Sequence, residues 1–206
     1  MQAEVLTTAA GVPVQGPLLL TPRVFGDERG FFFESWNQQA FNAAAGDTCF
    51  VQDNHSRSSR GVLRGLHYQL PPHPQGKLVR CALGEIFDVV VDLRRSSPTF
   101  GQWVGTVLNA TTHQQLWVPV GFAHGFLTLS EQAEVLYKTT DFWSRACERA
   151  IRWDDPQLAI AWPLEALAGA EPQLSEKDGE APLLAELAEG GLFSGNQPAT
   201  SGSRLG

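Results

Sequence analysis

A histidine in residues 64–69 occupies a position from which it could transfer protons. If this segment is a β-strand, His67 and Gln69 share one face, because side chains alternate along a strand. The apolar Leu66 and Tyr68 then share the other face. A histidine on the polar face of such a strand can act as a general base near neutral pH. It can also be a structural histidine that is hydrogen-bonded in a core, and spacing alone favours this second interpretation.

Two other residues have side chains that could assist a proton transfer. Lys77 begins a strand-like segment and could stabilise a negatively charged oxygen. Tyr137 shares a strand face with Val135 and Thr139 and could donate a proton to a carbanion. Each also has an ordinary role, since most lysines are solvated and most strand tyrosines are half-buried aromatics. Taken one at a time, both residues fit the ordinary role better.

Residues 119–124 read Pro-Val-Gly-Phe-Ala-His and resemble a motif of cupin barrels, where the histidine binds a metal in the metal-dependent members. Those members pair it with an H-x-H motif and a downstream glutamate. The two histidines that could take the place of the H-x-H motif here are His67 and His73, and the segment that joins them is proline-rich. A strand cannot aim both histidines at one metal through such a segment. The sequence therefore predicts a cupin-type barrel without the residues of a metal site.

The chain has 206 residues, of which 43% are hydrophobic, and a net charge of −7. This length fits one domain, and the acidic balance argues against general nucleic-acid binding, which needs a basic surface. The acidic net charge is still compatible with a local basic pocket for a phosphorylated small molecule. Five basic residues crowd one stretch, namely Arg57, Arg60, Arg64, Lys77 and Arg80. The polar clusters at residues 27–31 and 52–57 could be turns or could bind a ligand's base or phosphate.

The sequence also indicates a compartment. We find no signal-peptide pattern and no apolar run long enough to span a bilayer, so we expect no membrane partner. The three cysteines, Cys49, Cys81 and Cys147, are widely spaced. They suggest reduced thiols in a cytoplasmic protein instead of a disulfide framework.

Residues 84–94 are the clearest predicted strand. The odd-numbered residues from Phe87 to Leu93 would form an apolar face, and the even-numbered ones from Ile86 to Asp92 a mixed face. Further strands are expected at residues 78–82, 103–108, 115–118, 125–129 and 133–140, with turn signals between them. Many short strands at this spacing predict a mainly β sandwich or barrel.

Helical patterns are confined to residues 37–45 and 182–188. From residue 190 onward the chain is rich in Gly and Ser and has little to bury. We therefore predict a single folded domain over residues 1–189 and a flexible C-terminal tail over residues 190–206.

Taken in order, these segments resemble the dTDP-4-dehydrorhamnose 3,5-epimerase family over residues 16–187. The matching segments are residues 25–35, 50–56, 62–69, 75–80, 97–101, 116–126, 137–138 and 174–178. The resemblance implies a cupin-type antiparallel β-barrel (jelly-roll) with a few short helices, a homodimer, and no metal or cofactor. It implies a dTDP-4-keto-6-deoxyhexose substrate, dTDP-4-dehydro-6-deoxy-D-glucose, which is epimerised at C3 and C5.

The resemblance also assigns roles to residues. His67 would be the base, with Asp178 as the carboxylate that orients it. Lys77 would hold the C4 oxygen as charge develops, and Tyr137 would be the acid on the opposite face. The substrate-binding residues would be Arg29, Glu34, Gln52, Asp53, Asn54, Arg64, His124, Trp143, Glu148 and Lys177, with the Trp143 indole stacking on thymine. In this company, catalysis becomes the favoured interpretation of His67.

Three alternatives stay open from the sequence. A related epimerase would invert only C3 or only C5, and the presence of Tyr137 favours double inversion. A metal-dependent cupin oxygenase would need a metal for turnover. A non-catalytic sugar-binding barrel would bind the nucleotide without using His67 for turnover.

Overall fold

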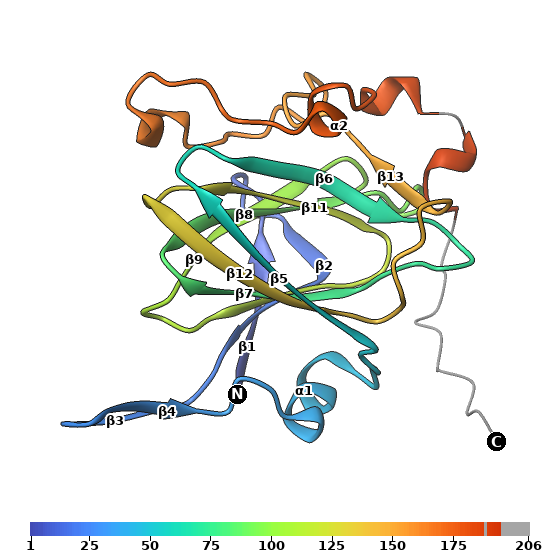
Figure 1. Cartoon of the computed structure of the whole chain (residues 1–206). Coiled ribbons are helices and arrows are strands. Elements are labelled where there is room, and N and C mark those ends of the chain that lie inside the picture. Colours follow the sequence, from blue (N-terminus) through green and yellow to red (C-terminus); the bar gives the residue numbers. More distant parts are fainter. Residues whose placement is uncertain (188, 195–206) are drawn as a thin grey trace.

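The computed structural model describes residues 1–187 and 189–194 and consists mainly of two antiparallel β-sheets packed face to face (Figure 1). The first sheet has the order β1 (Gln2–Thr7), β2 (Pro13–Thr21), β10 (Gln115–Val118), β7 (Lys77–Leu83), β12 (Gln132–Thr139) and β5 (Gln52–Ser59). The second has the order β13 (Glu148–Ala150), β6 (Leu63–Gln69), β11 (Phe122–Thr128), β8 (Glu85–Asp92) and β9 (Trp103–Asn109). The predicted mainly β, antiparallel fold is confirmed.

The alternation predicted for residues 84–94 is confirmed in β8. Ile86 and Val90 lie in the core between the two sheets, where they pack with residues of β7, β9, β10, β11 and β12. Val89, Val91 and Leu93 belong to a second core on the outer face of the same sheet. The two faces of one strand therefore serve two separate cores, as the period of two requires.

The outer core is covered by residues 151–187 and 189–193, drawn in orange and red on the β6 side in Figure 1. Leu158, Trp162 and Leu184 pack there against Leu66 and Tyr68 of β6. This segment includes α2 (Glu176–Gly179) and the short 3-10 helices η1 (Leu164–Leu167), η2 (Leu184–Glu186) and η3 (Glu189–Gly191). Covering the outer face of β6 in this way leaves the opposite face of the strand free to line the interior.

Helix α1 (Gln38–Ala45) confirms the helix predicted at residues 37–45. Asn37 caps it, because its side chain accepts a hydrogen bond from the backbone N–H of Ala40 at 3.0 Å. Phe41 of this helix packs edge-on against Trp117 on the outside of the first sheet. The helix predicted at residues 182–188 is much shorter, since it is the single turn η2, and Ala188 lies outside the described residues.

The packed part of the chain extends beyond the predicted boundary at Glu189. Leu192 and Phe193 are buried in the outer core, and Arg95 donates its backbone N–H to the carbonyl of Phe193. Two large apolar side chains therefore anchor a stretch that composition alone presented as tail. The remainder of the predicted tail, residues 195–206, lies outside the described residues.

A hairpin of β3 (Val24–Asp27) and β4 (Gly30–Phe33) projects away from the two sheets at the lower left of Figure 1. Phe31 and Phe32 on this hairpin are 64% and 67% exposed, which is unusual for phenylalanine. Within the described residues, no helix is both long and apolar enough to cross a membrane.

Candidate active site

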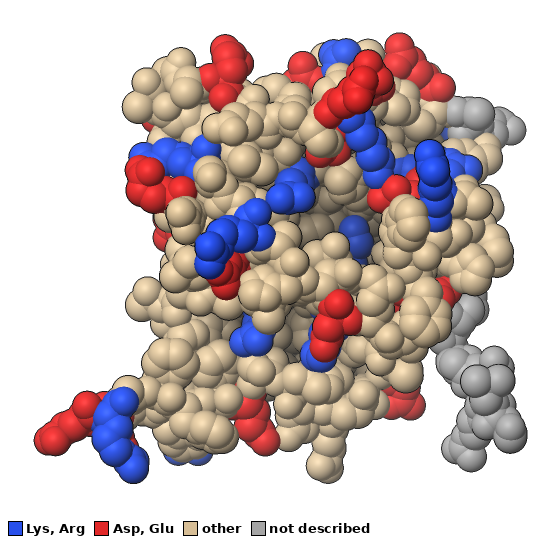
Figure 2. Space-filling model, in the orientation of Figure 1, with Lys and Arg blue, Asp and Glu red and all other residues tan. Residues whose placement is uncertain are grey.

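A cavity of about 320 Å³ lies between the two sheets. Both sheets contribute to its wall, which consists of Gln52, Asn54, His67, Tyr68, Gln69, Gln75, Lys77, Tyr137, Trp143 and Glu148. Figure 2 shows one face of the molecule hollowed near its middle, with Lys and Arg side chains around the hollow. This cavity brings together His67, Lys77 and Tyr137, which are up to 70 positions apart in the chain.

His67 points into the cavity from β6, as the predicted alternation requires. Its Nε2 lies 2.6 Å from Oδ1 of Asp178, whose side chain is only 4% exposed. Asp178 belongs to α2, which is capped by Ser175. The Ser175 hydroxyl donates to the second carboxylate oxygen, Oδ2, at 2.8 Å. The cap of one short helix thus fixes the carboxylate that orients the histidine.

Asp178 is held in its ionised form. Burial alone would raise its pKa, but the hydrogen bond and charge of His67 and the hydrogen bond from Ser175 outweigh burial. The pKa of Asp178 therefore lies below its ordinary value. An ionised carboxylate at this distance accepts a hydrogen bond from Nε2–H of His67 and so fixes the orientation of the ring.

Lys77 is the first residue of β7 and lies beside His67. Its Nζ donates to the backbone carbonyl of His67 at 3.2 Å. Burial lowers its pKa to about 8, while the charges of Glu148 and Asp88 act in the opposite direction. The ammonium group is therefore a cation with little water around it, which is the environment in which a charge stabilises an oxyanion most strongly.

Tyr137 faces the cavity from β12, in the sheet opposite to the one that carries His67. Burial raises the pKa of its hydroxyl above the ordinary value, although the charge of Arg64 opposes this effect. The phenol is therefore protonated at neutral pH and can act as a donor. His67 and Tyr137 consequently lie on opposing walls of the cavity.

His124 and Arg64 are not part of the cavity wall. His124 is buried in β11, whose first residue is Phe122 instead of the Gly125 expected from the sequence. Its Nε2 lies 2.5 Å from Oδ1 of Asp88, and it pairs in register with His67 on β6. The Nε of Arg64 donates to Ser58 Oγ at 3.0 Å, so its charge acts on Tyr137 from outside the wall.

The segment 52–54 divides its side chains between the cavity and the outside. Gln52 and Asn54 line the cavity, and Gln52 donates to Asn54 Oδ1 at 2.9 Å. Asp53 alternates to the other face of β5, where its carboxylate accepts hydrogen bonds from Lys138 Nζ at 2.9 and 3.1 Å. Two of the three residues predicted here for substrate binding therefore reach the cavity, and Asp53 does not.

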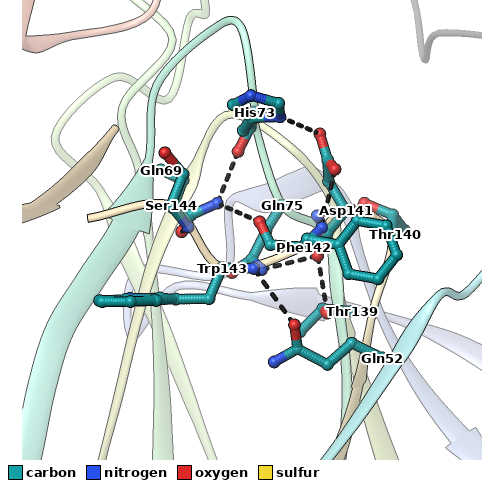
Figure 3. Close-up of polar contacts among 11 residues, drawn as sticks. Gln52, Gln69, His73, Gln75, Thr139, Thr140, Asp141, Phe142, Trp143 and Ser144 are labelled. Carbon is teal, nitrogen blue, oxygen red and sulfur yellow. Dashed lines mark hydrogen bonds and ion pairs between the residues drawn. The ribbon is translucent and has the colours of Figure 1, made fainter. Parts of the chain in front are cut away.

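Trp143 and Glu148 also line the cavity. Trp143 is 55% exposed, and Figure 3 shows its indole ring extending away from the polar contacts that hold the surrounding loop. Glu148 pairs with Lys177 Nζ at 2.7 Å. Burial alone would raise the pKa of Glu148, but the hydrogen bond and charge of Lys177 lower it, so this carboxylate is ionised.

Arg29 and Glu34 lie away from the cavity of their own chain. Arg29 is at the tip of the β3–β4 hairpin, where it pairs with Asp27. Glu34 follows the hairpin and accepts a hydrogen bond from the side chain of Asn37 at 3.1 Å. The sequence predicted both as substrate-binding residues, and the structure does not bring them to the other site residues within one chain.

Gln69 and Gln75 line the cavity, although the sequence did not assign them to the site. For Gln69 the signal was present, because it shares the predicted strand face of His67. For Gln75 no such signal existed, since its place depends on the loop between β6 and β7. In the described part of the chain, no group of three or more His, Cys, Asp or Glu residues is arranged to hold a metal ion.

The two-sheet antiparallel barrel is a cupin-type fold, and its cavity carries a histidine–carboxylate pair opposite a tyrosine. The chain belongs to the dTDP-4-dehydrorhamnose 3,5-epimerase family, whose sequence profile matches residues 11–186. The resemblance drawn from the sequence is thereby confirmed, and so is the expectation that the chain is an epimerase of this family.

Known relatives match over most of their length. The dTDP-4-dehydrorhamnose 3,5-epimerase of Pseudomonas aeruginosa is 60% identical over 179 residues, which cover 86% of this chain and 96% of that protein. The crystal structure of the epimerase of Legionella pneumophila, in complex with dTDP-4-keto-L-rhamnose, has a TM-score of 0.86 at 45% identity and covers 95% of this chain and 100% of its own. A 3'-monoepimerase of Streptomyces bikiniensis, in complex with dTDP-quinovose, has a TM-score of 0.77 at 36% identity, with 84% and 85% covered.

Proposed function

We propose that this enzyme converts dTDP-4-dehydro-6-deoxy-D-glucose into dTDP-4-dehydro-L-rhamnose by inverting C3 and C5. The observation that carries the proposal is the arrangement of His67 and Tyr137 on opposing walls of one cavity, with Lys77 beside the histidine. C3 and C5 both flank the C4 ketone, so removal of either proton gives an enolate. Inversion requires a base on one side of the sugar ring and an acid on the other, which opposing walls can supply.

His67 acts as the base in this proposal. Nε2–H donates a hydrogen bond to ionised Asp178, which leaves Nδ1 as the nitrogen that accepts a proton from the sugar. As the ring becomes positively charged, the carboxylate stabilises it. The proton taken from C3 or C5 thus passes to His67, while the electron pair of the broken C–H bond moves into the enolate.

Lys77 stabilises the enolate, and Tyr137 reprotonates it at C5. The negative charge develops on the C4 oxygen, where the desolvated ammonium of Lys77 favours it. Tyr137 then delivers its phenolic proton to C5 from the face opposite to His67 and so inverts that centre. At C3 the enolate carbon takes its proton from solvent water on that same face. His67 and Tyr137 restore their protonation states by exchange with solvent, so the steps require no cofactor.

The nucleotide is proposed to lie toward Trp143. Its exposed indole offers a flat surface on which a thymine base can stack. Gln52 and Asn54 on the same side of the cavity offer amide groups for hydrogen bonds to the base or sugar. The Glu148–Lys177 pair adds a carboxylate and a cation to this part of the site. The proposed nucleotide-sugar substrate favours a cytoplasmic location. The widely spaced free cysteines favour it as well, because thiols stay reduced in the cytoplasm.

We further propose that the enzyme is a homodimer in which the β3–β4 hairpin of one protomer reaches the cavity of its partner. Support comes from the exposed Phe31 and Phe32 on a hairpin that projects from its own chain. It would also explain why Arg29 is separated from the site that it was predicted to serve. Arginine is suited to a diphosphate because its donors form a planar fork.

Mixing two inactive variants tests this arrangement. In a heterodimer of His67→Asn and Arg29→Ala protomers, one cavity combines an intact His67 with an intact Arg29 from the partner. We expect mixed and re-equilibrated protein to recover activity that neither variant has alone. Failure of recovery, with heterodimers present by native mass spectrometry, would refute the shared site, and a monomer in sedimentation experiments would refute the dimer.

Reaction in deuterium oxide tests the double epimerisation. If both centres are inverted through enolates, NMR of the product shows deuterium at C3 and at C5. Deuterium at one carbon alone, as a monoepimerase would give, contradicts the proposal.

A further inference from the structure

Gln69 is a buried glutamine whose side chain connects the two loops at the rim of the cavity. It lies at the end of β6, is 3% exposed, and shares the cavity-facing side of the strand with His67. Its Nε2 donates to the carbonyl of His73 at 2.6 Å and to the carbonyl of Phe142 at 3.2 Å. Its Oε1 accepts a hydrogen bond from the backbone N–H of Ser144 at 2.7 Å. One amide therefore binds backbone groups of the β6–β7 loop and of the β12–β13 loop (Figure 3).

Two of these contacts are placed on either side of Trp143. Phe142 and Ser144 are its immediate chain neighbours, and both are held by the same amide. The backbone N–H of Trp143 itself donates to Gln52 Oε1 at 3.2 Å. The peptide groups before, at and after Trp143 are thus fixed by glutamines of β5 and β6. The indole ring takes part in none of these contacts, and Trp143 as a whole is 55% exposed.

Other contacts, which do not involve the indole, hold the start of the same loop at Asp141. Gln75 Nε2 donates to the carbonyl of Asp141 at 2.7 Å, and Thr139 Oγ1 donates to the same oxygen at 2.9 Å. His73 Nδ1 lies 3.2 Å from Asp141 Oδ2. These contacts fix the start of the loop, and Gln69 fixes the part that carries Trp143.

From this geometry we propose that Gln69 is a positioning residue for nucleobase binding, which acts by holding the backbone of Trp143. The proposal rests on the function proposed above, in which Trp143 is the surface for the base. A stacking side chain on an exposed loop contributes more affinity when its position is fixed before binding, because less conformational entropy is then lost. A buried amide with both donors and its acceptor used supplies that fixation.

The test is the affinity for dTDP, measured by calorimetry, together with the kinetic constants. Gln69→Met keeps the size of the side chain but removes all three hydrogen bonds. We expect dTDP to bind about 10- to 30-fold more weakly, with KM raised to the same extent. We expect kcat to change by less than about threefold, because saturating substrate compensates for weak binding.

Gln115→Met is the matched control. Gln115 is also a buried glutamine, 1% exposed, whose Nε2 donates to a loop carbonyl, that of Ser35 at 3.0 Å. It lies on β10 and does not line the cavity. We expect this variant to lose thermal stability to a similar extent and to bind dTDP as the wild type does.

A double-mutant cycle with Trp143→Ala decides the mechanism. If Gln69 acts through Trp143, Gln69→Met has no further effect on dTDP affinity once the indole is absent. If the two effects multiply, Gln69 does not act through Trp143, and the inference is overturned while the proposed function stands. If Trp143→Ala alone leaves dTDP affinity unchanged, the proposed base-stacking surface fails as well. Should Gln69→Met not fold, Gln69→Glu, which retains the acceptor for Ser144, enters the same cycle.

Discussion

Replacing Asp178 by Asn should lower kcat strongly while leaving the cavity intact. The carboxylate is nearly inaccessible to solvent and lies 2.6 Å from His67 Nε2, so it forms a charge-assisted hydrogen bond to the protonated ring. Such a bond contributes about 1.5–3 kcal/mol. This interaction strengthens as His67 takes a proton, so its loss raises the barrier and lowers kcat by roughly 10- to 150-fold.

The assay follows product formation from the dTDP-4-keto sugar by NMR, with dTDP affinity measured in parallel. We expect KM and the affinity for dTDP to change little, because Asp178 does not line the cavity. Ser175→Ala removes only the hydrogen bond to Asp178 Oδ2 and should have a smaller effect of the same kind. Asp154→Asn is a control, since Asp154 forms an exposed pair with Arg152. A kcat for Asp178→Asn within about twofold of wild type would refute the positioning role.

Three further predictions concern charge, stereochemistry and the fold. The pKa of Lys77 is about 8 and its cationic form is the active one, so kcat should fall as pH rises through that value. The Lys77→Met variant should not show this decline, and its kcat should be about 100-fold lower than that of the wild type. A wild-type kcat that does not change above pH 8 would contradict this prediction. Tyr137→Phe should give a product that is inverted at C3 but not at C5, as judged by NMR coupling constants, and full double inversion would exclude Tyr137 as the C5 acid. Phe193→Ala should lower the free energy of unfolding by about 3–5 kcal/mol in urea titrations, because Phe193 is buried in the outer core; a change below about 1 kcal/mol would show that this part of the chain contributes little.

The fold could be predicted from the sequence where the signal was local. Alternation in β8 and β6 assigned each side chain to a face correctly, and so identified the wall that carries His67 and Gln69. The helix at residues 37–45 followed from its own periodicity. Such signals depend only on neighbours along the chain, and strands and helices have fixed periods.

The features that local sequence patterns do not show depend on contacts between distant residues. Asp178 lies 111 positions from His67, and no pattern in either segment shows that α2 packs beside β6. Family resemblance supplied that pair before the structure did. Phe193 sits in a Gly/Ser-rich stretch whose composition indicates a tail, but its single large ring reaches the outer core. Arg29 was predicted as a substrate-binding residue through the family resemblance, but the direction of its hairpin separates it from the cavity of its own chain.

The central claim is that His67 is the base for both carbons, and isotope exchange in deuterium oxide by His67→Asn tests it most directly. The variant should bind dTDP with wild-type affinity, because the nucleotide is proposed to lie toward Trp143. We predict that it incorporates no deuterium at either C3 or C5. Deuterium at either carbon at a rate near that of the wild type would show that another group removes that proton, and would contradict the account.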